Sequence, residues 1–418
     1  MTCFSTGVTD IQTNVNHLPD AIYDRLLDVI ALNIDHVFPA VAIAVIHRGR
    51  LVLDIGSGVI DPANRSGVVT PATRFDMASV TKLFTTTAFL ERVSAGKAAL
   101  DDPIVTVIPE FGAINPRGID GGQDPHSKVH LPTPPDLIGK TVDPTRVTFR
   151  HLLTHTSGLP PWRDVFNAAG PAPTPPDQPE LFRREDRWAR GLQAICAYPF
   201  VGEIGSGVRY SDLGLMLLGE AVMRLWSQTP GTLRLDQIIR AVVCDPLGLR
   251  SPIFNPVRSG IGRMTIAPTE DDPTWRKRRI WGEVHDENAC GVGGIAGHAG
   301  LFANAGDIAD FGQAWLSRDA RLNISPDLMI EASKQQVESN GERRGLGWMI
   351  KGRAGSSAGD KFSANSFGHT GFTGTSLWID PTRELVVATL TNRVYPGRAR
   401  EGILPFRRAV HDTLADLA

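Results

Sequence analysis

The amino-acid sequence predicts an α+β fold, in which an antiparallel sheet formed from both chain termini carries flanking helices beside a mainly helical lobe. Two strand-turn-strand patterns near opposite ends of the chain predict the sheet, and apolar helical patterns between them predict the lobe. The 418 residues are enough for a single unit with two lobes around a shared core. We expect an α/β lobe at about residues 18–100 and 345–418, and a helical lobe at about residues 101–344.

The two hairpins are predicted from runs of β-branched and aliphatic residues on either side of short turns. Residues 41–46 and 51–55 flank His47-Arg48-Gly49-Arg50, where the glycine tolerates a positive φ. Residues 376–379 and 385–391 flank a turn that begins Asp380-Pro381. Because one hairpin lies near each end of the chain, both ends are expected to contribute strands to one sheet.

Five segments have helical patterns, and two have the composition of long loops. Asp307 is expected to cap the helix that it begins. The loops, at residues 115–143 and 170–179, are dense in Pro, Gly and Asp, and loops of this length are usually functional rims or insertions. The predicted helices are residues 18–33, 79–94, 213–226, 307–316 and 402–417.

The composition excludes several classes of protein. The chain has 43 Lys and Arg against 45 Asp and Glu, so it lacks the basic surplus that binding to nucleic acid or an anionic membrane requires. No run of about 18 apolar residues is present, so no membrane span is predicted. Residues 1–16 lack the basic and apolar parts of a secretory signal. The sequence as written therefore predicts a cytoplasmic protein, or a periplasmic or extracellular one if a leader was removed.

The first motif with catalytic chemistry is Ser79-Val80-Thr81-Lys82, at the start of a predicted helix. Residues three apart on a helix share a face, so the Lys82 amine can reach the Ser79 hydroxyl. A serine is a weak nucleophile until a base takes its proton, and a desolvated lysine can lose its charge and serve as that base. Ser-x-x-Lys alone also occurs on many solvated helices, but this helix is apolar on most faces, where a lysine without a function is costly.

Two further motifs can contribute to the same site. Tyr210-Ser211-Asp212 precedes an apolar helix, and a tyrosine there can accept or relay the serine proton. Taken alone, it also fits a core tyrosine followed by an Asp N-cap. The segment from Gly368 to Ser376 runs into the second hairpin, and its small residues allow close approach of a substrate, with His369 and Thr370 able to bind a carboxylate or an oxyanion. Taken alone, it also fits a Gly-rich turn.

The remaining histidines do not predict a metal site or a cofactor. His151 and His155 are four residues apart but lack the intervening Glu of a zinc-protease helix, so they are expected to form hydrogen bonds around a helix end. His285-Asp286-Glu287 is rich in ligand atoms, and His298 is expected near the floor of the active site in a backbone-orienting role. Tryptophans such as Trp162 fit either an apolar acyl pocket or core and rim positions. A phosphate-binding glycine loop is missing from the sequence.

In this order, the three motifs resemble those of the serine β-lactamase and penicillin-binding protein family, whose signature is Ser-x-x-Lys with a Lys-Thr-Gly strand. The sequence is most similar to the branch with class C β-lactamases, D-Ala-D-Ala carboxypeptidases and family VIII carboxylesterases. In that branch the middle motif is Tyr-x-Asn and the last is Lys-Thr-Gly or His-Thr-Gly. The similarity also covers residues 151–159, 210–220 and 293–313, and it spans most of the chain from about residue 41. It implies the β-lactamase/transpeptidase fold.

The resemblance also implies a role for each matching residue. Ser79 corresponds to the serine that is acylated, Lys82 to its proton partner and Tyr210 to the second general base. His369-Thr370-Gly371 corresponds to the strand motif that lines the pocket, and the N–H groups of Ser79 and Phe372 to the oxyanion hole. Such donors contribute about 3 to 4 kcal/mol each in other hydrolases. Water then hydrolyses the acyl-enzyme with the same groups acting in reverse.

Two residues depart from the family pattern. Asp212 stands where Asn is usual, and its negative charge can keep Lys82 protonated and shift the role of base toward Tyr210. His369 replaces the lysine of β-lactamases, which removes a permanent cation that would bind the carboxylate of a β-lactam. Both changes favour an esterase or a peptidase over a β-lactamase.

The sequence therefore predicts a serine hydrolase that acts through an acyl-enzyme on ester or D-amino-acid amide substrates, as a β-lactamase-like carboxylesterase or a D-Ala-D-Ala carboxypeptidase. The alternatives are a weak β-lactamase or penicillin-binding protein with slow deacylation, and a catalytically inactive binding module. The expected partner is a small-molecule ester, peptide or β-lactam substrate. No nucleic acid, cofactor or metal is expected, and no motif indicates an oligomeric state.

Overall fold

The computed structural model describes residues 11–125, 127–227, 232–399 and 401–417, and its main element is an antiparallel sheet built from both ends of the chain. The first predicted hairpin consists of β2 (Ala40–His47) and β3 (Arg50–Asp61), joined where Arg48 and Gly49 have φ of 50° and 73°. The second consists of β16 (Ser376–Asp380) and β17 (Leu385–Thr391). Strand β17 pairs with β2 along its whole length, which confirms the predicted fold class.

The sheet extends further than the sequence predicts. Its strands lie in the order β1-β3-β2-β17-β16-β15-β14-β13-β12, with β4 paired to β3. The strands on the far side of β15 are short and partly polar, so they lack the alternation that marks a strand in a sequence. The remaining bounds are β1 Gln12–Asn16, β4 Ser66–Val68, β12 Val337–Ser339, β13 Glu342–Arg344, β14 Met349–Ile350 and β15 Phe367–Thr370.

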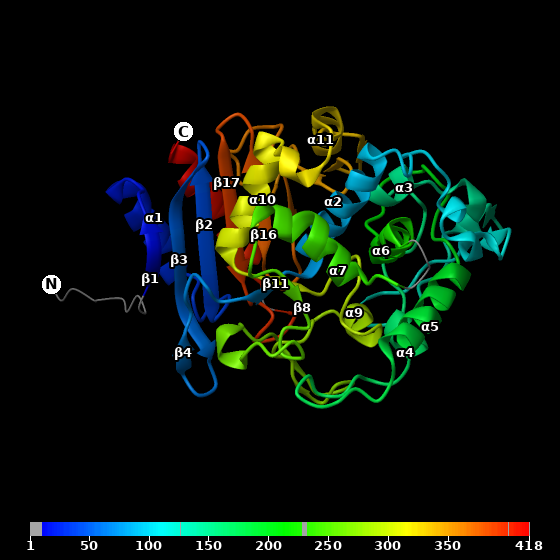
Figure 1. Ribbon diagram of the computed structural model, residues 1–418, viewed down its shortest axis with the longest axis horizontal. Coiled ribbons are helices and arrows are strands. Elements are labelled where there is room, and N and C mark those ends of the chain that lie inside the picture. The colour runs from blue at the N-terminus through cyan, green and yellow to red at the C-terminus, as the bar shows by residue number, and fades with distance from the viewer. Residues whose placement is uncertain (1–10, 126, 228–231, 400, 418) are drawn as a thin grey trace.

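Helices cover both faces of the sheet, which explains why β2 is apolar at almost every position. Val41, Ile43 and Val45 pack in the cluster that includes α1 (Asp20–Ala31) and α12 (Ile403–Leu414). The alternate residues of β2, three of them alanine, pack in the main core with α10 (Ala305–Ser317), which lies across the sheet in Figure 1. Successive strand side chains point to opposite faces, so both faces of β2 are buried.

The cap of α10 differs from the prediction, which was wrong for Asp307. The helix begins at Ala305, and its N-cap is Asn304, whose side chain accepts from the Asp307 N–H at 2.9 Å. The Asp307 carboxylate instead accepts from the backbone N–H groups of Arg250 and Ser251. Asn and Asp are equally good caps, and only the geometry of the preceding loop decides between them.

The middle of the chain is largely helical and lies to one side of the sheet (Figure 1). The three-stranded sheet of β5 (Phe75–Asp76), β11 (Leu301–Ala303) and β8 (Ile253–Phe254) joins it to the segment before Ser79. The other helices are α2 Thr81–Ser94, α3 Phe149–Leu153, α4 Val165–Ala169, α5 Arg184–Ala197, α6 Asp212–Trp226, α7 Leu235–Ile239, α8 Asp245–Leu247, α9 Glu287–Gly291 and α11 Pro326–Ser333.

The two predicted loops carry little regular structure. Residues 115–143 contain the short strand pair β6 (Arg117–Gly118) and β7 (Thr141–Val142), and 170–179 contain neither helix nor strand. Outside the loops, β9 (Asp271–Asp272) pairs with β10 (Arg278–Arg279). Among the described helices, none has the length and apolar character needed to cross a membrane. The cellular compartment stays a prediction.

Gly297 lets the loop before β11 lie directly against α6, and its replacement tests this packing. A Cβ at Gly297 would lie 2.1 Å from the Leu215 carbonyl oxygen and 3.0 Å from Gly219, which are backbone atoms that cannot rotate away. We expect Gly297→Ala to lower the free energy of unfolding by about 1–3 kcal/mol, the usual effect of overpacking. Gly262→Ala is the control, because a Cβ there meets nothing within 4 Å. Equal denaturant midpoints for the two variants would contradict this account.

Candidate active site

Ser79 lies where the sheet meets the helical segment, in a 3-10 turn (Ala78–Val80) that leads into α2. The Asp76 carboxylate fixes this turn by accepting from the Ala78 N–H at 2.8 Å and from the His285 N–H at 2.6 Å. Ala78 has φ of 45°, a left-handed conformation that costs a residue with a Cβ about 1–2 kcal/mol. The bonds to Asp76 hold the backbone in this conformation, and Ser79 is therefore presented at a defined position.

The turn after β15 is bonded to the same segment. Thr373 Oγ1 donates to the Asp76 carbonyl at 2.7 Å, and Thr375 Oγ1 donates to the Met77 carbonyl at 2.9 Å. A Cβ at Gly371 would lie 2.6 Å from that Met77 oxygen, so only glycine allows this approach. Residues Ser79 and Phe372 consequently line the same pocket. The structure brings the two residues of the predicted oxyanion hole together, and their role stays a prediction.

Lys82 is buried and contacts three oxygen atoms. Its Nζ lies 2.8 Å from Ser79 Oγ, 2.8 Å from Asp212 Oδ1 and 3.1 Å from the His298 carbonyl oxygen. Burial opposes the charged form, but the Asp212 carboxylate and the Tyr210 oxygen outweigh it, so the pKa of Lys82 lies above its ordinary value. The predicted contact between Asp212 and Lys82 is present, and the ammonium form dominates at neutral pH.

Tyr210 lies immediately before the start of α6, with its ring 4.6 Å from the ring of His155 and 5.0 Å from Lys82 Nζ. Its hydroxyl interacts with both Lys82 and Ser79. Burial raises the pKa of Tyr210, and this effect exceeds the opposing effect of Lys82. The three predicted catalytic residues thus form one cluster, in which both candidate bases hold their protons at neutral pH.

The strand motif is present, but its histidine is uncharged. His369 is buried in β15, its ring lies 6.0 Å from that of Tyr210, and its Nδ1 donates to the Thr370 carbonyl at 2.9 Å. Burial, with Lys82 and Arg344 nearby, holds the pKa of His369 well below its usual range. The sequence predicts that this position lacks the permanent cation of a lysine. In the structure, His369 carries no positive charge at neutral pH.

A pocket of about 230 Å³ lies at Ser79. Four of the predicted residues line it: Ser79, Tyr210, Asp212 and Phe372. Lys82, His369 and Gly371 are buried beside it. Thr370 is half-buried against Met349. The pocket is also lined by His298, which the sequence places near its floor, and by Trp162, for which an apolar pocket is one of two expected positions. The lining residues that were not predicted as part of the site are Ala78, Pro125, Pro161, His285, Asp286, Glu287, Ala299 and Arg398. His285, Asp286 and Glu287 stand out in the sequence only as a cluster of possible ligand atoms, and no pattern points to Arg398.

Arg398 does not leave the pocket with a free positive charge. Its guanidinium Nη2 lies 2.5 Å from Glu270 Oε1 and 2.7 Å from Glu287 Oε1. His285 contacts the same Glu270 carboxylate at 3.0 Å and stacks on the Phe372 ring at 5.6 Å. This wall of the pocket is therefore an ion-pair network rather than an anion-binding site.

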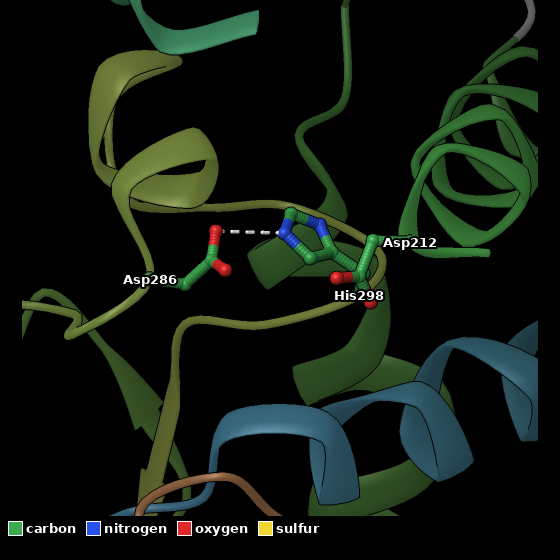
Figure 2. Close-up of side chains that lie close together, drawn as sticks. All are labelled: Asp212, Asp286 and His298. Atoms are coloured by element: carbon green, nitrogen blue, oxygen red, sulfur yellow. Dashed lines mark hydrogen bonds and ion pairs between the residues drawn. The ribbon is translucent and has the colours of Figure 1, made fainter. Parts of the chain in front are cut away.

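Asp212, Asp286 and His298 lie together beside the pocket, with donor atoms within 4.8 Å of one another (Figure 2). A cation could bridge such a set, but two of its interactions are already made. The Lys82 ammonium faces Asp212 at 2.8 Å, and His298 Nε2 contacts Asp286 at 2.9 Å. His151 and His155 make the predicted hydrogen bonds around α3, to Thr148 and to the Ser211 N–H.

The sequence of this chain is related over most of its length to known proteins. A family model described as Beta-lactamase matches residues 13–412. The chain belongs to the β-lactamase family. A provisionally named D-alanyl-D-alanine carboxypeptidase of Escherichia coli (strain K12) is 30% identical over 386 residues, which are 87% of this chain and 80% of that protein. Its counterpart in Salmonella agona (strain SL483) is 29% identical over 91% of this chain and 85% of that protein.

Solved structures share the fold at lower identity. EstCE1, described as a hydrolase with promiscuous acyltransferase activity, has a TM-score of 0.68 and 20% identity over 94% of this chain and 99% of that chain. A penicillin-binding protein homologue from Caulobacter crescentus has a TM-score of 0.67 and 20% identity over 98% of this chain and 100% of that chain. Together with the family membership, these findings make the protein a serine hydrolase of the β-lactamase fold.

The contact between Asp212 and Lys82 predicts how activity depends on pH. The carboxylate raises the pKa of Lys82, so its replacement in Asp212→Asn lowers that pKa and increases the free-base fraction near neutrality. We expect the ascending limb of the pH profile of kcat/KM for an activated ester to move to lower pH. Glu287→Gln, which removes a pocket carboxylate paired with Arg398, is the control and should leave the limb in place. A limb that stays fixed or moves to higher pH in Asp212→Asn would contradict this assignment.

Proposed function

We propose that this hydrolase cleaves esters through an acyl-enzyme on Ser79, as a β-lactamase-like carboxylesterase. The observation that carries the proposal is the cluster of Ser79, Lys82 and Tyr210 at a pocket whose cationic side chain is already paired. Ser79 Oγ lies 2.8 Å from Lys82 Nζ, close enough to pass its proton to the free-base form of that amine.

The proposed reaction proceeds from the fraction of the enzyme in which the Lys82–Tyr210 pair has lost one proton. Ser79 Oγ then bonds to the ester carbonyl carbon while its own proton passes to that pair. The backbone N–H groups of Ser79 and Phe372 stabilise the negative charge that develops on the carbonyl oxygen. The tetrahedral intermediate then loses the alcohol, which takes the proton from the pair as the carbon–oxygen bond breaks. Water hydrolyses the acyl-enzyme, releases the acid and restores Ser79.

The charges around the pocket favour neutral acyl groups. Asp212, Asp286 and Glu287 line it, and each already contacts a lysine, histidine or arginine side chain. A substrate carboxylate close to the reacting carbonyl therefore finds no unpaired cation among the described lining residues to offset its charge. Arg398 is paired with two carboxylates, and His369 is neutral because burial lowers its pKa. β-Lactams and D-Ala-D-Ala peptides both carry such a carboxylate, and esters need not.

A second candidate is a D-Ala-D-Ala carboxypeptidase. It is supported by the name of the relatives at about 30% identity and by the position of Arg398 in the pocket wall. An incoming substrate carboxylate could replace Glu287 as a partner of Arg398. The carboxypeptidase reaction requires the ion pair between Arg398 and Glu287 to open. The ester reaction proceeds with that ion pair intact.

Covalent labelling tests the nucleophile. We expect a fluorophosphonate to add one adduct to the wild-type protein, as measured by intact-protein mass spectrometry, and none to Ser79→Ala. The same substitution should lower kcat/KM for an activated ester by roughly 10⁴-fold or more, because an acyl-enzyme cannot form. Turnover that survives in folded Ser79→Ala would refute the proposal. An unlabelled wild-type protein would also refute it and would favour an inactive binding module.

Paired substrates test the preference for neutral acyl groups. We expect kcat/KM for a neutral nitrophenyl ester to exceed that for the matching ester with a free carboxylate beside the carbonyl by about tenfold or more, since one uncompensated charge contact at about 4 Å is worth about 1–4 kcal/mol between bulk water and a protein surface. An acylated D-Ala-D-Ala peptide and a penicillin extend the series. Faster release of D-alanine than of the neutral alcohol would favour the carboxypeptidase.

A further inference from the structure

A second pair of titratable side chains, His298 and Asp286, lies in the wall of the pocket (Figure 2). Asp286 is the N-cap of α9, and its Oδ1 accepts from the Ala289 N–H at 2.7 Å and contacts His298 Nε2 at 2.9 Å. Burial opposes the charged form of Asp286, but the His298 ring and this N–H outweigh it and lower its pKa. Asp286 is therefore a carboxylate, and Nε2 is the ring nitrogen that donates to it.

The other ring nitrogen of His298 is unused. When the ring carries a single proton, on Nε2, its Nδ1 presents a lone pair. This atom has no hydrogen-bond partner among the described residues, although the side chain is only 1% exposed. Figure 2 shows the ring between Asp286 and Asp212, beside the pocket that Ser79 lines. A buried acceptor without a partner costs about 1–3 kcal/mol, so its presence next to a reactive serine calls for a function.

The position of His298 is fixed relative to the reacting groups. Its carbonyl oxygen accepts from Lys82 Nζ at 3.1 Å, which is the backbone-orienting role that the sequence predicts. Gly297 packs directly on α6, so the loop cannot shift without displacing that helix. The charged and titratable groups around the ring are Asp286 at the start of α9, Asp212 at the start of α6, and Lys82 on α2.

His298 also has an advantage over the other bases near Ser79. Lys82 and Tyr210 hold their protons, because both pKa values lie above their ordinary ranges. Burial and nearby cations hold the pKa of His155 and of His369 well below the usual range, so each is a weak base. His298 contacts the carboxylate of Asp286, which orients the ring and can stabilise an imidazolium. Among the described residues, His155 and His369 have no such carboxylate partner.

We propose that His298 is a further catalytic residue, whose Nδ1 takes a proton from the water that hydrolyses the acyl-enzyme, with Asp286 as the residue that positions it. This inference rests on the proposed acyl-enzyme at Ser79. The water oxygen bonds to the acyl carbon as Nδ1 receives the proton, and the tetrahedral intermediate then breaks its bond to Ser79 Oγ. The proton returns to that oxygen through Asp212 and Lys82, which contact each other at 2.8 Å.

The test separates the two halves of the reaction. In His298→Gln, the terminal amide can still donate to Asp286, but the basic nitrogen is lost. We expect the decay of the acyl-enzyme, followed by intact-protein mass spectrometry after an excess of activated ester is removed, to slow by about 100-fold or more. The rate of acylation should change far less. Added hydroxylamine, a nucleophile that does not need a base, should release the acyl group from wild type and variant at similar rates.

Two further variants keep the test decisive. Asp286→Asn retains the N-cap and the volume of the side chain, and it should slow deacylation in the same direction even if His298→Gln does not fold. His411→Gln removes a buried histidine that bonds to Ser357 on the far layer of the sheet, and it should leave deacylation unchanged. The proposal would be overturned if His298→Gln and Asp286→Asn hydrolysed the acyl-enzyme at the wild-type rate. It would also be overturned if acylation and release by hydroxylamine slowed in these variants as much as hydrolysis does.

Fluorophosphonate labelling distinguishes this failure from a failure of the proposed function. Labelling of wild type and His298→Gln at Ser79, combined with unchanged deacylation, would refute only the role of His298. An unlabelled wild-type protein would refute the acyl-enzyme itself and the inference with it.

Discussion

The site depends on the hydrogen bonds around Asp76 and Met77. The Asp76 carboxylate is fully buried, and burial raises its pKa, so its place in the core is costly unless every acceptor is used. Its oxygens receive the Ala78 and His285 N–H groups, and the two carbonyls of the segment receive the hydroxyls of the turn after β15. One short segment therefore sets the positions of the nucleophile, the proposed oxyanion turn and one wall of the pocket at the same time.

The charges of the site occur in pairs, and this decides what each group can do. Lys82 is paired with Asp212, and Arg398 with Glu270 and Glu287, while Asp286 contacts His298 Nε2. A paired lysine is a proton donor and electrostatic stabiliser more than a base at neutral pH. The pairing also leaves no uncompensated cation on the described pocket wall to attract an anionic substrate. The proposed preference for neutral substrates rests on this pairing.

Much of the fold could be predicted because β2, β3, β16 and β17 are continuous apolar runs between clear turns. The strands β12–β14 could not, because their few residues gain strand geometry only from the neighbouring strand. Ser79 and Lys82 were predictable since their spacing within one helix fixes their contact, and Tyr210 and His369 followed from the family motifs. The pair of Asp286 and His298 was not, because their contact depends on how α9 meets the loop before β11, and nothing local encodes that. The paired state of Arg398 was hidden for the same reason.

The connection between Asp76 and the turn after β15 has a consequence for synthesis of the protein. The hydrogen bond from Thr373 to Asp76 joins residues 297 positions apart. A ribosome that adds about 5–20 residues per second needs about 15–60 s to supply the second partner after the first. During that interval β2 lacks its partner β17, and the face of β2 that packs with α10 stays uncovered until residues 305–317 have been made. Ser79 therefore gains its surroundings only when nearly the whole chain has been made.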